Sequence, residues 1–129
     1  MRHRYKHRLD LVVGVKGPKI AMTEMLTNLV TSGHVTTTEK KAFVLKAHAD
    51  SFFSRLVQTY NAQADEKNSR RLCAGIIKSH IYGDIAGKKL LNEILPKFLK
   101  DNKVSGFVAD YKVGFRKGDG SLKVLLKLE

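Results

Sequence analysis

The chain has 129 residues, 43% of them hydrophobic, and no apolar stretch approaches the roughly 18 residues that a membrane-spanning helix needs. Lysine and arginine number 24 against 12 aspartate and glutamate, so the net charge is +12 and the pI is about 10.0. These values favour one soluble domain with a polyanionic partner. Nucleic acid suits this charge better than a membrane, because no helix pairs a basic face with a broad exposed apolar face.

Cysteine content and the N-terminus indicate the compartment. Cys73 is the only cysteine, so neither an internal disulfide nor a cysteine-based zinc site can form, and the thiol is expected simply to pack. The N-terminus carries charge without the apolar segment and cleavage site of a signal peptide. We therefore expect an unprocessed cytoplasmic protein.

The first eight residues are strongly basic and follow neither a helical nor a strand period. Arginine can bind a phosphate with two hydrogen bonds, and tyrosine can stack on a base. Two histidines four residues apart lack the further ligands that a metal site needs, so we expect no metal and no other cofactor. The predicted RNA-binding residues of this tail are Arg2, His3, Arg4, Tyr5, Lys6, His7 and Arg8.

The predicted domain organisation is a basic N-terminal extension, residues 1–17, and a single α+β domain, residues 18–129. An apolar run at residues 9–15 suits a strand or a segment against a partner, and its role stays open. The domain begins with a helix from Pro18 to about Ser32, followed by a left-handed cap and a short strand over residues 34–37.

The longest run with one helical period extends from Thr36 to Tyr60 and predicts the helix around which the domain packs. About 25 residues at 1.5 Å each give a helix roughly 37 Å long. Thr36 and Glu39 have the spacing of a capping box. We expect Phe53 at the margin of the buried face, which comprises Ala42, Leu45, Ala49, Phe52, Leu56 and Tyr60.

Two further helices are predicted over residues 69–81 and 85–100, and Pro96 should bend the second. In the first of them the inward residues are Leu72, Cys73, Ile76, Ile77 and His80.

The C-terminal segment changes to a period of two, which predicts an antiparallel hairpin around the turn at residues 118–120. The expected apolar face comprises Phe107, Ala109, Tyr111, Val113 and Phe115 on one strand and Leu122, Val124, Leu126 and Leu128 on the other. The fold class that follows is α+β, with a small three-stranded sheet packed against about four helices. The predicted open face of the sheet carries Lys112, Arg116, Lys123 and Lys127.

Several stretches, in this order and spacing, resemble the bacterial large-subunit ribosomal protein family numbered seventeen. They are Met1-Arg-His-Arg4, Gly33-His-Val-Thr-Thr-Thr-Glu-Lys-Lys-Ala42, Leu90-Leu-Asn-Glu-Ile-Leu-Pro96, Gly106-Phe107 and Arg116-Lys-Gly-Asp119. The resemblance implies a structural protein that binds large-subunit ribosomal RNA near the polypeptide exit side, with other ribosomal proteins as neighbours. It implies no enzymatic activity, no small-molecule substrate and no membrane partner.

The charge pattern predicts the same class. Lys41, His48 and Arg55 recur every seven residues and form a stripe beside the buried helical face, which is either a phosphate-binding surface or a solvated flank. We also predict RNA contacts for Arg116 and Lys117 in the C-terminal motif.

Other classes fit the sequence less well. A DNA-binding protein of the nucleoid type would need a self-complementary dimer face and an element shaped for a groove. An RNA-processing enzyme would need a nucleophile with a base, paired carboxylates or a metal set, and the scattered histidines and aspartates form none of these. A non-ribosomal RNA-binding or assembly module remains the alternative.

Overall fold

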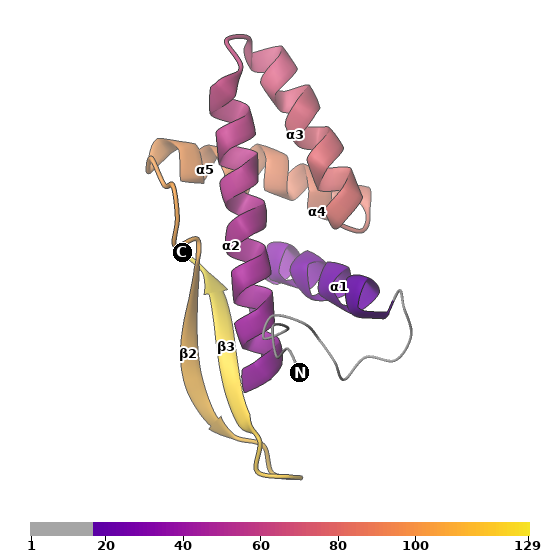
Figure 1. Cartoon of the computed structure of the whole chain (residues 1–129), viewed down its shortest axis with the longest axis vertical. Helices are drawn as coiled ribbons and strands as arrows, with labels where there is room; N and C mark the ends of the chain where they lie inside the picture. The colour runs from indigo at the N-terminus through magenta and orange to yellow at the C-terminus, as the bar shows by residue number, and fades with distance from the viewer. Residues whose placement is uncertain (1–16) are drawn as a thin grey trace, which may run out of the picture.

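The computed structural model describes residues 17–129 and shows a three-stranded antiparallel sheet packed against helices (Figure 1). The strand order is β1-β3-β2, so the C-terminal strand pairs with both others. The predicted α+β fold is confirmed. The elements in chain order are α1 (Gly17–Ser32), β1 (His34–Thr38), α2 (Glu39–Ala62), α3 (Glu66–His80), α4 (Asp84–Lys89), the π-helical turn η1 (Leu90–Ile94), α5 (Leu95–Lys100), β2 (Val108–Phe115) and β3 (Leu122–Leu128).

Helix α2 is the element around which the domain packs, as its length and period predict. It runs along the long axis of the molecule, with the β2–β3 hairpin beside one half and α3 beside the other (Figure 1). Its side chains join one hydrophobic core with residues of the other helices and the sheet. The buried residues of α2 are Ala42, Val44, Leu45, Ala49, Phe52, Phe53, Leu56 and Val57.

The beginning of α2 differs from the prediction. Thr36 lies in β1, opposite Leu125 of β3, and the helix starts at Glu39 after Thr38 as its N-cap residue. The N-cap side chain makes no capping hydrogen bond, so the predicted capping box is wrong. Pairing with β3 decides this boundary, because the β-branched threonines suit a strand better than a first helical turn.

Phe53 was expected at the margin of the buried face, and this expectation is also wrong. The side chain is fully buried and packs against Phe98 and Phe107 with ring centroids 5.4 and 5.9 Å away. Phe98 and Phe107 in turn lie 4.9 Å apart. These three rings, from α2, α5 and the residue before β2, form the aromatic centre of the core.

Helix α1 and strand β1 agree with the sequence prediction. Gly33 ends α1 with a positive φ of 80°, which favours glycine, and its N–H donates to the carbonyl of Leu29 at 2.8 Å. The chain then enters β1 directly at His34.

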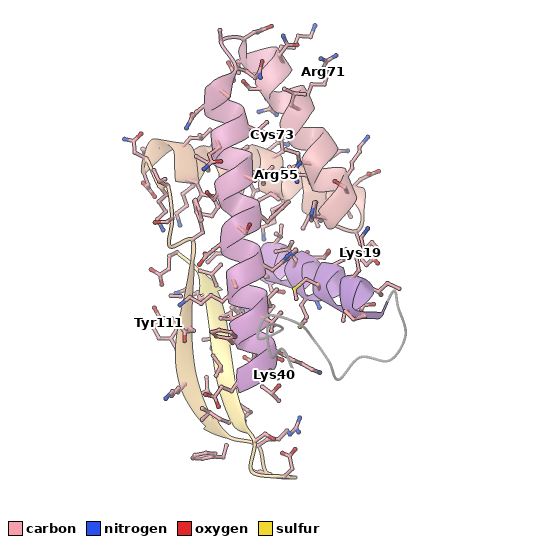
Figure 2. The ribbon with its side chains drawn as sticks, viewed as in Figure 1. Lys19, Lys40, Arg55, Arg71, Cys73 and Tyr111 are labelled. Atoms are coloured by element: carbon pink, nitrogen blue, oxygen red, sulfur yellow. The ribbon has the colours of Figure 1, made fainter. Side chains whose placement is uncertain are left out.

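Helix α3 begins earlier than predicted because Asp65 caps it, accepting a hydrogen bond from the N–H of Lys67 at 3.1 Å. Leu72 is 39% exposed, so its predicted inward position is wrong. Cys73 is fully buried, and its Sγ donates to the carbonyl of Leu56 at 3.6 Å. The thiol therefore packs between α3 and α2, as predicted (Figure 2).

The last predicted helix is a single helical run interrupted immediately before its proline. The N–H of Leu95 donates to the carbonyl of Leu90, five residues back, so η1 contains one π-helical turn. Pro96 follows in the first turn of α5, where a missing N–H costs little.

The β2–β3 hairpin is confirmed, but most of the predicted apolar face of β2 points away from the core. Asp110 lies opposite the fully buried Leu126 and pairs with Lys46 of α2 at 2.7 Å, so the even-numbered residues from Val108 to Lys112 are on the helix side of the sheet. Tyr111 and Val113 are 49% and 55% exposed. The sequence alternates in the predicted period, but pairing with β3 decides which set is buried.

The start of β2 is fixed by a side chain from α2. One carboxylate oxygen of Asp50 accepts hydrogen bonds from the N–H groups of Phe107 and Val108, at 3.1 and 3.2 Å. Both of these residues are buried. Asp50 thus satisfies two backbone donors and ties the strand to α2.

Candidate nucleic-acid interface

The predicted RNA-binding tail, Arg2, His3, Arg4, Tyr5, Lys6, His7 and Arg8, lies outside the described residues. The other predicted residues occupy two separate places. Lys41, His48 and Arg55 lie on α2, whereas Arg116 and Lys117 lie in the turn between β2 and β3.

The three stripe residues share one side of α2 but differ in environment. Arg55 is exposed, whereas Lys41 and His48 are half-buried. Fourteen residues at 1.5 Å each place Lys41 and Arg55 about 21 Å apart along the helix. The stripe is therefore long enough to follow several phosphates of an RNA backbone.

His48 lies in the seam between α2 and the end of α3. Its ring centroid is 6.1 Å from that of His80, and the His80 ring lies 5.2 Å from Phe52. Burial lowers the pKa of His48 below 6.5, and the nearby His80 lowers it further. The middle residue of the stripe is thus neutral at neutral pH, and the fixed positive charges are those of Lys41 and Arg55.

The hairpin turn organises Arg116 around a carboxylate. Arg116 Nε donates to Asp119 Oδ1 at 2.8 Å, and a second guanidinium nitrogen contacts the other carboxylate oxygen. This pairing holds the pKa of Asp119 well below its usual range and raises that of Arg116. The same carboxylate accepts from the N–H of Ser121 at 3.1 Å. Part of the hydrogen-bonding capacity of the Arg116 guanidinium is therefore used within the turn, by Asp119. Lys117 is exposed in the same turn.

The prediction of a basic open face on the sheet is correct for two lysines of β3 but not for Lys112 of β2. Lys123 and Lys127 do share the side of β3 that faces away from the buried Val124 and Leu126. Lys112, however, lies opposite Val124 and therefore on the helix side, where it lines a groove between α2 and β2. Its expected place on the open face is wrong, because β2 packs in the opposite sense to the prediction.

Sequence reasoning also missed cations that the tertiary structure brings together. Lys19 of α1 and Lys78 of α3 line one groove between these helices, beside Thr23 and Tyr82. Figure 2 shows Lys19, Lys40 and Arg71 on three different helices, so the positive charge is spread over the helical part of the domain. Lys19 and Lys78 belong to no sequence motif, so only the packing of α1 against α3 could have identified the pair.

Exposed aromatic residues on the hairpin were missed for a different reason. Phe115 is 72% exposed and Tyr111 is 49% exposed, although the alternating pattern placed both in the core. The hydroxyl of Tyr111 donates to a carboxylate oxygen of Glu129 at 2.9 Å.

The described residues offer little that resembles a catalytic centre. No group of three or more histidine, cysteine, aspartate or glutamate side chains that could hold a metal ion occurs among residues 17–129. None of the helices in this range is long and apolar enough to span a membrane. The features that stand out are basic and exposed.

A family model described as ribosomal protein L17 matches residues 21–129. The chain belongs to this family. Relatives named large ribosomal subunit protein bL17 support the assignment. The protein from Coprothermobacter proteolyticus is 34% identical over 125 residues, covering 95% of this chain and 97% of the relative. That from Fervidobacterium nodosum is 26% identical over 132 residues, covering 99% and 98%.

A third relative of the same name, from Opitutus terrae, is 29% identical over 128 residues, covering 98% of this chain and 72% of the relative. As a member of the L17 family, the chain is a structural protein of the large ribosomal subunit in the cytoplasm and not an enzyme. The resemblance noted in the sequence is thereby confirmed.

Proposed function

We propose that this L17 family member binds large-subunit ribosomal RNA through three basic surfaces. They are the N-terminal extension (residues 1–17), the stripe on α2, and the cations of the β2–β3 turn. The observation that carries the proposal is the net charge of +12 on a large-subunit protein of 129 residues. Such an excess gives strong, salt-dependent attraction to a phosphate backbone.

The extension supplies the densest charge, with four arginine or lysine residues among its first eight. It leads into α1, which begins at the last residue of the extension, Gly17. Charge at this density is well suited to phosphates from more than one RNA segment, with Tyr5 available to stack on a base. We further propose that the neighbours of the protein are other large-subunit proteins near the polypeptide exit side.

The stripe on α2 supports the proposal through geometry. Lys41 and Arg55 project from the same side of a straight element about 21 Å apart, with His48 between them. A neutral histidine can donate one hydrogen bond to a phosphate without adding charge. The stripe therefore contributes two cations and one polar group to the RNA surface.

Replacing Lys41 and Arg55 by glutamine tests the stripe. The double substitution keeps helix propensity nearly constant and should leave stability almost unchanged. Affinity for a large-subunit RNA fragment should fall, and the slope of log K against log salt should decrease in magnitude by up to about 2, because two phosphate contacts are lost. Filter binding over a range of salt concentrations measures both quantities.

The matched control replaces Lys97 and Lys100 of α5 by glutamine. Both are exposed, and the net charge changes by the same amount. If the two double variants lose equal affinity, net charge rather than the stripe governs binding. If the Lys41 and Arg55 variant keeps the wild-type slope, the stripe is a solvated flank.

A further inference from the structure

The tip of the β2–β3 hairpin is the part of the sheet that projects farthest from the core. It extends beyond the N-terminal end of α2, as Figure 1 shows. Phe115, the last residue of β2, is 72% exposed there, and Lys117 follows in the turn. A large aromatic ring at this position contributes little to the core, so most of its surface is accessible to a partner.

A β-bulge sets the direction of this ring. Lys112 lies opposite Val124, but Gly114 lies opposite Lys123, so β2 contains one residue more than β3 at this point. In a regular strand, Phe115 would share the open face with Tyr111. The bulge instead places Phe115 opposite Leu122, on the side of the sheet that carries Lys112.

The bulge therefore groups one aromatic ring with cations on both sides along the chain. Lys112 lies three residues before Phe115 on the same side of the sheet, and Lys117 lies two residues after it in the turn. All three are exposed. Asp119, the carboxylate of the turn, is paired with Arg116, so it opposes an anionic ligand less than a free carboxylate would.

An exposed ring between cations is the arrangement by which proteins bind unpaired nucleotides, with the base stacked on the ring and phosphates held by lysine. We propose that the hairpin tip binds an unpaired nucleotide of RNA, with its base stacked on Phe115 and the adjacent phosphates held by Lys112 and Lys117. This inference rests on the proposed RNA-binding function and adds a contact to single-stranded rather than duplex RNA.

The excess of positive charge favours RNA over a protein partner at the tip. A protein segment would cover an apolar ring with apolar side chains, but the residues beside Phe115 in the turn are Arg116, Lys117 and Gly118. Charge complementarity thus selects a polyanion, and the ring selects one with a flat, unstacked group.

The first test compares the full-length protein with a Phe115→Ala variant on two probes, a 12-nucleotide single-stranded RNA and the same sequence as a duplex. The substitution should weaken single-strand binding about 5- to 150-fold. It should leave duplex binding unchanged and leave the salt slope the same, because no charge is lost. The Phe115→Tyr variant should restore single-strand binding, because it keeps the ring.

Two further variants separate stacking from charge. The Lys112→Gln, Lys117→Gln double variant should lower the magnitude of the single-strand salt slope by about 1.4, at about 0.7 for each contact. Val104→Ala is the matched control, because Val104 is 70% exposed in the loop before β2. This substitution should change neither the affinity for single-stranded RNA nor the salt slope. Circular dichroism should show all variants folded, since each side chain is exposed.

A fluorescence measurement provides an independent readout. The chain contains no tryptophan, so Phe115→Trp introduces a single reporter ring. Single-stranded RNA should quench its emission by stacking, whereas a Val104→Trp reporter should respond little. Binding without quenching would overturn the stacking contact.

The remaining outcomes are distinguishable. If the wild-type protein binds neither probe nor a large-subunit RNA fragment, the proposed function fails together with this inference. If the wild-type protein binds and Phe115→Ala binds equally well, only the hairpin contact is overturned. If Phe115→Ala keeps its RNA affinity but no longer enters large subunits in cells, the ring contacts a protein instead, which also overturns the inference.

Discussion

Two adjacent phenylalanines of α2 show that packing in the core differs from one residue to the next. Phe53 touches Phe98 and Phe107 and has no exposed surface, whereas its neighbour Phe52 lies at the edge of the same core and contacts His80. Both belong to α2 and are adjacent in the chain. Their positions differ because successive residues of a helix point about 100° apart.

We expect Phe53→Ala to lower the free energy of unfolding by about 3–5 kcal/mol, because it leaves a cavity between two fixed aromatic rings. Urea denaturation measures this change. Leu72→Ala is the control, since the 39% exposed Leu72 should cost less than about 1 kcal/mol. Similar losses for the two variants would show that Phe53 is not central to the core.

At the scale of elements, the seam between α2 and α3 contains one pH-sensitive side chain, that of His48. His48 and His80 face each other with ring centroids 6.1 Å apart, and burial keeps the pKa of His48 below 6.5. In the unfolded chain His48 takes up a proton near pH 6.5. Between these two pKa values the unfolded state binds more protons, so stability rises with pH and is lost as the pH falls.

We therefore expect the free energy of unfolding to decline as the pH is lowered from 7 to 5, and to decline less in a His48→Gln variant. The carboxylates with lowered pKa values, Asp110 and Asp119, have ordinary values of 3.8 and act below this window. Chemical denaturation at several pH values measures the difference. Parallel pH profiles for the two proteins would count against a lowered His48 pKa.

The whole molecule combines a compact domain with a large positive charge. The proposed function divides this charge among the extension, the α2 stripe and the hairpin turn. These surfaces belong to different elements, so removing one should weaken RNA binding without unfolding the domain. Counterion release provides a measure of each contribution, because the salt slope counts phosphate contacts.

Deleting residues 1–8 removes Arg2, Arg4, Lys6 and Arg8. We expect weaker binding to a large-subunit RNA fragment and a slope smaller in magnitude by up to about 3.6, at about 0.9 for each contact. Thermal unfolding should hardly change, because the core lies within residues 26–126. An unchanged slope would remove the extension from the RNA surface.

How much of the structure the sequence predicts depends on whether a pattern of apolar residues defines one possible buried face or two. The helices around residues 17–32 and 39–62 have one apolar face each, so their existence and most of their buried residues could be predicted. The segment 107–115 has apolar residues at every odd position but also Val108, and alternation alone does not say which parity meets the core. Pairing with the buried strand β3 makes that choice, and the bulge at Val113 reverses it near the tip.

The properties of the candidate site also divide into those that the sequence indicates and those that depend on the tertiary structure. Charge is additive, so composition alone favoured a polyanionic partner, and the order of short motifs indicated the family. Only the tertiary structure decided that burial lowers the pKa of His48, that Arg116 is paired within its turn, and that Phe115 is exposed on the side of the sheet that carries Lys112. These properties depend on burial and on partners distant in sequence, because α3, β3 and the bulge supply the surroundings that a linear pattern does not contain.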